Sequence, residues 1–209
     1  MSDESSVPDD TRPDSLHGRR FSLVPLTVEY HRFLYRLSVR DENTFRWRYH
    51  GAVPPFDAFE RSLYAGVLCQ FVISPTGNPE KLAGLVVAYN ASLQSDYCFL
   101  AIIADRGAGA GIFEGLALFL RYLLDHWPLR KIYLEAPEYN VVQFASLVRA
   151  GLLKEEARFK EHQYFAGRYW DLVTYAIYRE DLLRFGERFD ALFLPDSGSL
   201  QSDDPICRS

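Results

Sequence analysis

Apolar residues along this chain fall into runs with the two-residue period of strands and runs with the spacing of helices. Alternation, or an apolar run bounded by turn residues, predicts strands at 21–26, 66–74, 82–91, 96–104, 132–135, 152–164 and 169–178. Apolar positions three and four apart predict helices at 28–39, 41–49, 56–64, 112–127 and 140–150. Thr27 would cap the first helix and Gly151 would end the last. The order of elements predicts a mixed α/β domain.

The charge is concentrated at the two ends of the chain. The net charge is −5, yet residues 1–18 hold five acids and one base, and residues 196–209 hold three acids and one base. Both ends have the Ser, Asp and Pro composition of disordered segments. We therefore expect one folded domain over residues 19–195 between two acidic tails. The nearly neutral body offers no basic surface for nucleic acid.

Composition excludes several other classes of protein. No apolar run is long enough to span a membrane, and the acidic N-terminus is unlike a signal peptide. Cys69, Cys98 and Cys207 lack a CxxC spacing, which favours reduced thiols in a cytoplasmic protein. The five histidines are scattered, so we expect no metal site. The sequence leaves open whether the chain forms a homodimer.

The most informative stretch is a glycine-rich turn between the apolar strand at 99–104 and the apolar helix that Pro128 ends. Gly107, Gly109 and Gly111 remove side chains where the chain must turn and where a ligand could approach the backbone. The first N–H groups of a helix have no partner within it, and the helix dipole is positive there. The turn is therefore a candidate anion site; the alternative is a glycine-rich loop without a ligand.

The spacing of the glycines narrows the choice of anion. A dinucleotide fingerprint needs a glycine at its sixth position, where this chain has Ile112 or Glu114, and a Walker loop needs a lysine that is absent here. The pattern that remains is Arg106-x-x-Gly109-x-Gly111.

With this pattern the chain resembles the GNAT superfamily of acetyl-CoA-dependent N-acetyltransferases, whose pyrophosphate-binding turn is similar to residues 106–111. Leu134-Glu135, Asn140 and Ala150-Gly151-Leu152 follow in the order of that family. Gly167-Arg-Tyr-Trp-Asp171 resembles the branch that acetylates protein N-termini, such as the N-terminal alanine of ribosomal proteins. The resemblance spans about residues 21–181. It implies a GNAT-like, mostly antiparallel sheet of six to seven strands with helices on both faces, and acetyl transfer to a primary amine of a small molecule or a protein N-terminus.

The resemblance also implies where acetyl-CoA would bind. The strands ending near Ile103 and Glu135 would separate to admit the pantetheine arm. The predicted cofactor site consists of main-chain groups of the first of these strands, the turn, and one amide side chain: Leu100, Ala101, Ile102, Ile103, Arg106, Gly107, Ala108, Gly109, Ala110, Gly111 and Asn140. Asn140 has an alternative role as the N-cap of the following helix.

Glu135 is the candidate general base. Neutralising a lysine-like amine at pH 7 costs roughly 4–5 kcal/mol, whereas an α-amino group costs about 1 kcal/mol. Alternation places Glu135 on the same face as Tyr133, among apolar strand neighbours. The alternative is an exposed glutamate in a surface ion pair, and Glu138 is a weaker candidate for the base.

The general acid departs from the family pattern. The resemblance implies a tyrosine seven residues after Asn140, and this chain has Leu147 there. Ser146 is the adjacent hydroxyl and our candidate, with Tyr139 as another choice. The departure leaves open a CoA-binding protein of this fold without catalysis, and a transferase of longer acyl chains is a further alternative.

Three residues are candidates for contact with the acceptor: Trp47, Tyr169 and Asp171. Trp47 lies where aromatic and basic residues interleave, in a region that walls the acceptor pocket in the resembled family. Tyr169 and Asp171 would recognise a cationic amine. For each of them a purely structural role is the alternative.

Overall fold

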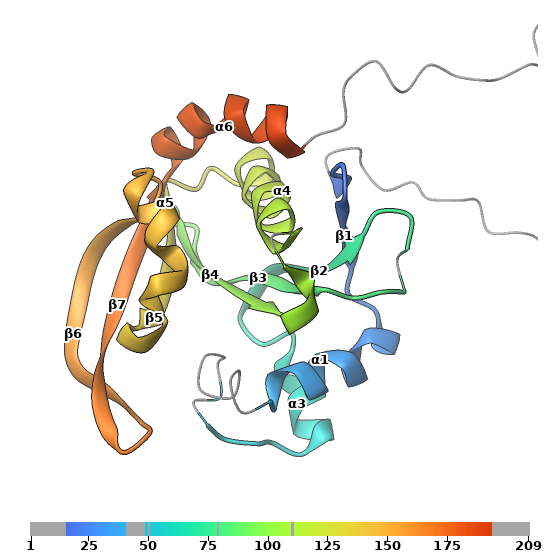
Figure 1. Cartoon of the computed structure of the whole chain (residues 1–209), viewed down its shortest axis with the longest axis vertical. Helices are drawn as coiled ribbons and strands as arrows, with labels where there is room; N and C mark the ends of the chain where they lie inside the picture. The colour runs from blue at the N-terminus through green and yellow to red at the C-terminus, as the bar shows by residue number, and fades with distance from the viewer. Residues whose placement is uncertain (1–15, 41–48, 50, 79, 110, 194–209) are drawn as a thin grey trace, which may run out of the picture.

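The computed structural model describes residues 16–40, 49, 51–78, 80–109 and 111–193. One sheet of seven strands runs through the domain in the order β1-β2-β3-β4-β5-β7-β6 (Figure 1). The strands are β1 (Phe21–Pro25), β2 (Val67–Pro75), β3 (Gly84–Ser92), β4 (Tyr97–Ala104), β5 (Lys131–Pro137), β6 (Lys154–Phe165) and β7 (Arg168–Tyr178). The pair β4–β5 is parallel and the other neighbours are antiparallel.

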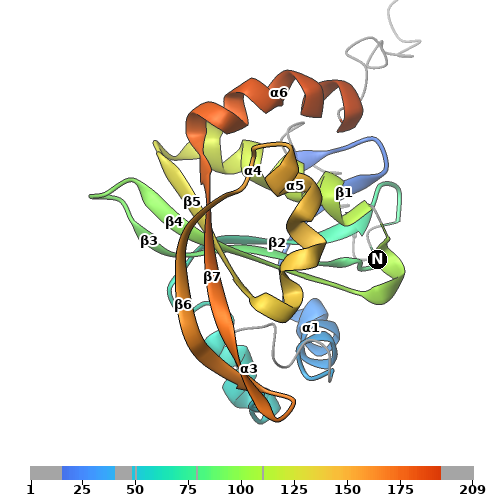
Figure 2. The same cartoon turned by 60° about the vertical axis from the view of Figure 1, so that its left-hand side comes forward.

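Helices lie on both faces of the sheet. On one face lie α1 (His31–Ser38), which follows the 3-10 helix η2 (Val28–Tyr30), and α3 (Phe56–Ser62). The long helix α4 (Gly111–His126) crosses the other face, and α6 (Arg179–Phe193) packs against it (Figures 1 and 2). The mixed, mostly antiparallel sheet with helices on both faces, expected from the sequence, is confirmed.

Two apolar cores correspond to the two faces. The larger one holds α4 residues such as Phe119 and Leu123 against β-strand residues such as Ile73, Leu100 and Ile132. The smaller one joins α1 and α3, through residues such as Leu34 and Phe59, to the outer face of β2, β3 and β4. This second core covers the sheet only as far as β4, so the same face of β5, β7 and β6 has no helix on it among the described residues.

The helical predictions needed several corrections. The first helix begins as η2, and the hydroxyl of Thr27 donates to Glu29 Oε2 at 2.9 Å instead of capping it. The helix expected at 140–150 is a 3-10 helix, η4 (Glu138–Phe144), followed by the short α5 (Ala145–Arg149). The helix expected at 41–49 lies almost wholly outside the described residues. Across the described residues no helix is long and apolar enough to cross a membrane.

Both ends of the domain differ from expectation. Leu16, which the sequence analysis placed in the N-terminal tail, is 3% exposed and packs in the larger core. The pattern analysis assigned no element after residue 178, yet α6 follows β7 directly. Leu182 and Phe185, three residues apart, pack against the larger core. The sequence did carry a signal for this helix, because Leu182, Phe185, Phe189 and Leu192 are spaced three and four apart.

Candidate functional site

The parallel strands β4 and β5 separate partway along their length. They pair at Tyr97–Lys131, Cys98–Ile132 and Phe99–Tyr133, and beyond Phe99 the pairing stops. A cleft of about 270 Å³ lies between them and continues over the start of α4 and η4. The lining is mostly apolar: Val87, Tyr89, Leu100, Ala101, Ile102, Ile103, Ala104, Ile112, Phe113, Leu116, Leu134, Glu135, Ala136, Pro137, Asn140, Gln143, Phe144, Gln163 and Leu172. The expected separation of the two strands is present.

One edge of β4 presents main-chain groups to this cleft. The N–H of Asp105 donates to the carbonyl of Ala83 on the β3 side at 2.8 Å. Residues of an antiparallel pair point their N–H and C=O alternately to either neighbour, and β3 and β4 keep one register from Gly84–Ala104 to Tyr89–Phe99. The groups of Ile103 and Ala101 therefore point to β3, and those of Leu100 and Ile102 point into the gap. Of the four predicted β4 residues, these two can bond a ligand through their main chain.

The glycine turn follows β4 directly. The 3-10 helix η3 (Arg106–Ala108) leads to Gly109, whose φ of +56° and ψ of −148° are open only to glycine at low cost. A Cβ built on Gly109 meets nothing within 4 Å, so the space beside it is open. The turn leads directly into the 16-residue helix α4. A turn at a helix N-terminus is an arrangement that favours anions. Ala110 lies outside the described residues.

Gly111 has a different reason to be glycine. A Cβ there would lie 1.9 Å from Cε2 of Phe21, so β1 packs where a side chain would be. The sequence analysis took all three glycines as making room for a ligand, and for Gly111 this was wrong because its missing side chain makes room for an aromatic ring.

A carboxylate in the first turn of α4 is directed away from the glycine turn. Glu114 is fully buried, and its Oε1 accepts hydrogen bonds from the main-chain N–H groups of Arg20 at 2.8 Å and Phe21 at 3.3 Å. The Nε of Arg20 lies 3.4 Å from Oε2. Because these donors hold the carboxylate at the start of β1, it does not occupy the helix N-terminus where an anion would bind.

Glu135 lies on the rim of the cleft. It is exposed, faces the same side of β5 as Tyr133, and stands opposite Thr174 of β7. It is the one charged side chain among the described residues that line the cleft. The alternative of a surface ion pair finds no partner for Glu135 within the described part of the chain. Glu138, the weaker candidate, is exposed on η4 and lies 3.5 Å from Arg158.

Asn140 also lines the cleft. Pro137 holds the N-cap position of η4 and Asn140 lies inside it, so its alternative role as a cap was wrong. The amides of Gln143 and Gln163 line the cleft as well. The sequence analysis missed both, because Gln163 comes from the distant β6 and no spacing links it to the turn.

The candidates for the general acid lie elsewhere. Ser146 is exposed on α5 and is not part of the cleft lining, so the structure does not bring it together with Glu135. Leu147 packs against the larger core. The ring of Tyr139 contacts Phe165 and Trp170, at centroid distances of 4.8 and 5.2 Å. Tyr89 is the one hydroxyl-bearing side chain among the described lining residues.

The predicted acceptor contacts on β7 also lie away from the cleft. Tyr169 is 62% exposed and its ring contacts Tyr164 near the hairpin turn. Asp171 accepts hydrogen bonds from Lys160 Nζ at 2.7 Å and from the N–H of Glu161 at 3.1 Å. These bonds lower the pKa of Asp171, and they hold the irregular stretch of β6 where Glu161 has a φ of +49°. Trp47 lies outside the described residues.

Comparison with known proteins places the fold. The sequence matches no protein-family model and no curated protein. The structure resembles spermidine N-acetyltransferase from Vibrio cholerae in complex with CoA and spermine, with a TM-score of 0.67 and 21% identity over 78% of this chain and 98% of that chain. A structure of the same enzyme with manganese ions gives a TM-score of 0.63 and 22% identity over 79% and 96% of the two chains.

The fold is that of a GNAT N-acetyltransferase. At this level of identity the likeness shows the fold, and it does not single out the branch that acetylates protein N-termini.

No three His, Cys, Asp or Glu side chains gather as a metal site within the described ranges.

Proposed function

We propose that this protein is an acetyl-CoA-dependent N-acetyltransferase that acetylates a primary amine by direct attack in a ternary complex. The observation that carries the proposal is the cleft where β4 leaves β5. It has main-chain groups along one wall, a helix N-terminus at one end and a single carboxylate among its described lining residues. These are the features that fixing a thioester cofactor and deprotonating an amine require.

The cofactor would lie along β4. The glycine turn at 106–111 would bind the pyrophosphate through the main-chain N–H groups that lead into α4. The main chain of Leu100 and Ile102 and the amide of Asn140 would hold the pantetheine arm. Acetyl-CoA would supply the acetyl thioester when bound; the chain's part is to fix its position and to exclude water with apolar residues such as Ile112 and Phe144.

Glu135 is the proposed base. The ammonium form gives one proton to Glu135, and the neutral nitrogen then forms a C–N bond to the thioester carbonyl. As the C–S bond breaks, this nitrogen loses a second proton, which passes to water or replaces the proton that Tyr89 gives to the leaving thiolate. Deprotonation at pH 7 costs about 4–5 kcal/mol for a lysine-like amine and about 1 kcal/mol for an α-amino group. Glu135 accepts the proton in either case. The leaving thiolate takes a proton from Tyr89 or from water, since Ser146 stands outside the cleft.

The acceptor is a small amine or a protein N-terminus. The Vibrio cholerae enzyme of the same fold is described with spermine, which supports a small amine. The run from Gly167 to Asp171 supports the branch that acetylates the N-terminal alanine of ribosomal proteins. Small amines and peptides with a free N-terminus are therefore both candidate acceptors.

A second candidate is a CoA-binding protein without catalysis. Leu147, where the resembled family has a tyrosine, packs against the core, and Ser146 does not reach the cleft. Such a protein would bind CoA and release none from acetyl-CoA.

The experiment measures CoA release from acetyl-CoA, and from acyl-CoA of longer chains, with a panel of small amines and short peptides. We expect the protein to release CoA from acetyl-CoA. Glu135→Gln should lower the rate of release and leave the binding of CoA unchanged. CoA binding without release from any amine would favour the second candidate. Failure to bind CoA would overturn both.

A further inference from the structure

Aromatic rings gather beside Glu135 on the face of the sheet that α4 does not cover. Tyr89 of β3, Phe99 of β4 and Tyr133 of β5 stand opposite one another in the strand register. Their ring centroids are 5.9 Å apart for Tyr89–Phe99 and 5.3 Å for Phe99–Tyr133. Tyr97 contacts Phe99 at 6.1 Å and Tyr133 at 5.5 Å. We call these four residues the aromatic floor.

The aromatic floor and Glu135 belong to one surface. Side chains two residues apart on a strand point to the same face, about 6.6 Å apart along it. The ring of Tyr133 and the carboxylate of Glu135 are related in this way. Tyr89 itself lines the cleft, so the floor continues from the place where the amine would meet the thioester.

The rings of the floor are not ordinary core residues. All four are half-buried, and Phe99, Tyr97 and Tyr133 belong to neither apolar core. A patch of aromatic side chains that stays accessible beside a polar group is typical of a binding surface. The hydroxyl of Tyr133 accepts a hydrogen bond from Lys131 at 3.4 Å, which fixes its ring in place.

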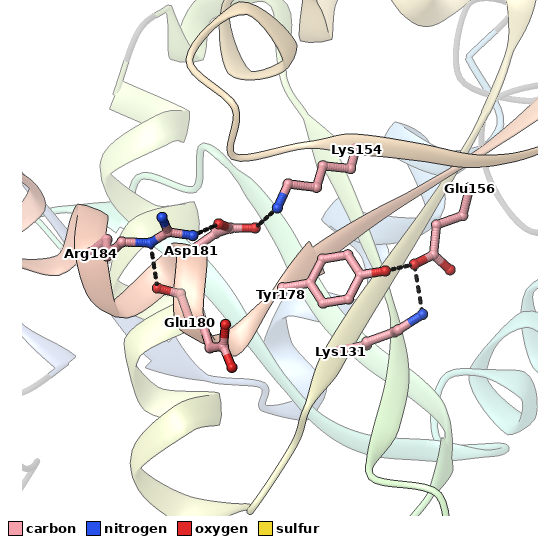
Figure 3. Close-up of polar contacts among 7 residues, drawn as sticks. All are labelled: Lys131, Lys154, Glu156, Tyr178, Glu180, Asp181 and Arg184. Carbon is pink, nitrogen blue, oxygen red and sulfur yellow. Dashed lines mark hydrogen bonds and ion pairs between the residues drawn. The ribbon is translucent and has the colours of Figure 1, made fainter.

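The acid beside Tyr133 and Lys131 already has partners. It is Glu156, whose Oε1 accepts hydrogen bonds from Lys131 at 2.6 Å and from the hydroxyl of Tyr178 (Figure 3). Burial alone would raise the pKa of Glu156, but these bonds lower it, and the bond to Glu156 raises the pKa of Lys131. Lys131 also lies over the rings of Tyr133 and Tyr178, at 5.5 and 4.8 Å.

The neighbouring acid is equally engaged. Asp181 binds both Lys154 and Arg184 (Figure 3). Neither Glu156 nor Asp181 is therefore free to bind a second ammonium, whereas a neutral ring would find aromatic side chains to pack on.

We propose that the acceptor is an amine with a single positive charge, carried on an aromatic body that rests on the aromatic floor while the nitrogen reaches Glu135. The strand spacing of about 6.6 Å between the two contacts corresponds to a link of roughly two or three carbons between nitrogen and ring. The inference rests on the proposed function and names the substrate class of that site. A free arylalkylamine and a peptide beginning with phenylalanine present the same chemistry.

The test compares 2-phenylethylamine, n-butylamine and spermidine. CoA release from acetyl-CoA is measured with each, and calorimetry measures the binding of each amine to the CoA-loaded protein. We expect kcat/KM for 2-phenylethylamine to exceed the other two by about tenfold or more, the usual scale for filling an apolar pocket. A peptide with phenylalanine at its N-terminus, run in parallel, distinguishes a protein terminus from a free amine as the source.

Variants of the floor give the second arm. Tyr133→Ala and Phe99→Leu should each lower kcat/KM for 2-phenylethylamine several-fold more than for n-butylamine, and Tyr133→Phe should retain the preference. Tyr164→Ala, at an exposed ring near the hairpin turn, is the matched control and should leave the preference unchanged. Rings also attract cations, so spermidine is the strongest competitor.

The outcomes separate the two proposals. A preference for spermidine or n-butylamine, or a preference for the aromatic amine that survives both Tyr133→Ala and Phe99→Leu, overturns the inference and leaves acetyl transfer standing. If no amine is acetylated, the proposed function fails and binding decides the inference. CoA-dependent binding of 2-phenylethylamine that Tyr133→Ala weakens supports it, and the absence of such binding overturns it.

Discussion

The two ends of the cleft differ in what they present to a ligand. Toward α4 the wall is main chain, with the free edge of β4 at Leu100 and Ile102 and the turn at Gly109. Toward the uncovered face of the sheet the wall is side chain, with Glu135 and the aromatic floor. A main-chain site depends on backbone shape, so few substitutions alter it. A side-chain site can change its acceptor while the fold and the cofactor end stay the same.

The largest effect should come from the side-chain end. Glu135→Gln removes the proposed base and keeps the shape of the residue, so we expect kcat to fall by about 10²–10⁴-fold. CoA affinity should stay the same because the cofactor end is main chain. Steady-state CoA release and calorimetry check the two parts. Glu180→Gln, at an exposed glutamate in the first turn of α6, is the control, and an equal loss in that variant would contradict a special role for Glu135.

The next effect concerns packing at the start of α4. Gly111→Ala places a Cβ against the ring of Phe21, so we expect the free energy of unfolding to fall by about 1–3 kcal/mol. Gly186→Ala is the matched helical control, because a Cβ there meets nothing within 4 Å. Alanine should stabilise that position by roughly 0.5–1 kcal/mol. Chemical denaturation measures both; an unchanged stability of Gly111→Ala would show that the ring moves aside freely.

A smaller effect is expected at the main-chain end. Gly109→Ala strains a backbone conformation that costs other residues about 1–3 kcal/mol. If about 1.4 kcal/mol of this strain is present only in the CoA-bound protein, CoA binds roughly tenfold more weakly. Gly167→Ala has the same type of strain, at a φ of +82° on the β6–β7 turn. Titration with CoA should show a lower affinity for Gly109→Ala and an unchanged affinity for Gly167→Ala.

The smallest effect lies outside both ends, in the β6–β7 hairpin. The hydrogen bond from Lys160, and then that from the N–H of Glu161, lower the pKa of Asp171. A carboxyl whose pKa is lower in the folded protein contributes stability above its unfolded pKa of about 3.9 and loses it as the pH falls toward the folded value. Unfolding measured between pH 6 and 2 should therefore show a loss of stability below about pH 4 that Asp171→Asn lacks. Parallel curves for the two proteins would contradict this assignment.

The main-chain end could be predicted from sequence because its parts are consecutive. A strand, three glycines and a helix follow one another directly between Tyr97 and His126, and the resemblance added Glu135 and Asn140. The reason for Gly111 could not be predicted, since Phe21 reaches it from ninety residues away. The same holds for the aromatic floor, which three strands assemble and which pairing register alone brings together. Asp171 looked like an acceptor contact until its partners across the hairpin were known.

The most direct test of the account is a crystal structure of the protein with CoA. We predict the pyrophosphate at the main-chain N–H groups between Gly109 and the start of α4, the pantetheine arm bonded to the main chain of Leu100 and Ile102, and the sulfur on the side of the cleft where Glu135 stands. CoA bound elsewhere, or a thiol directed away from Glu135, would contradict the account.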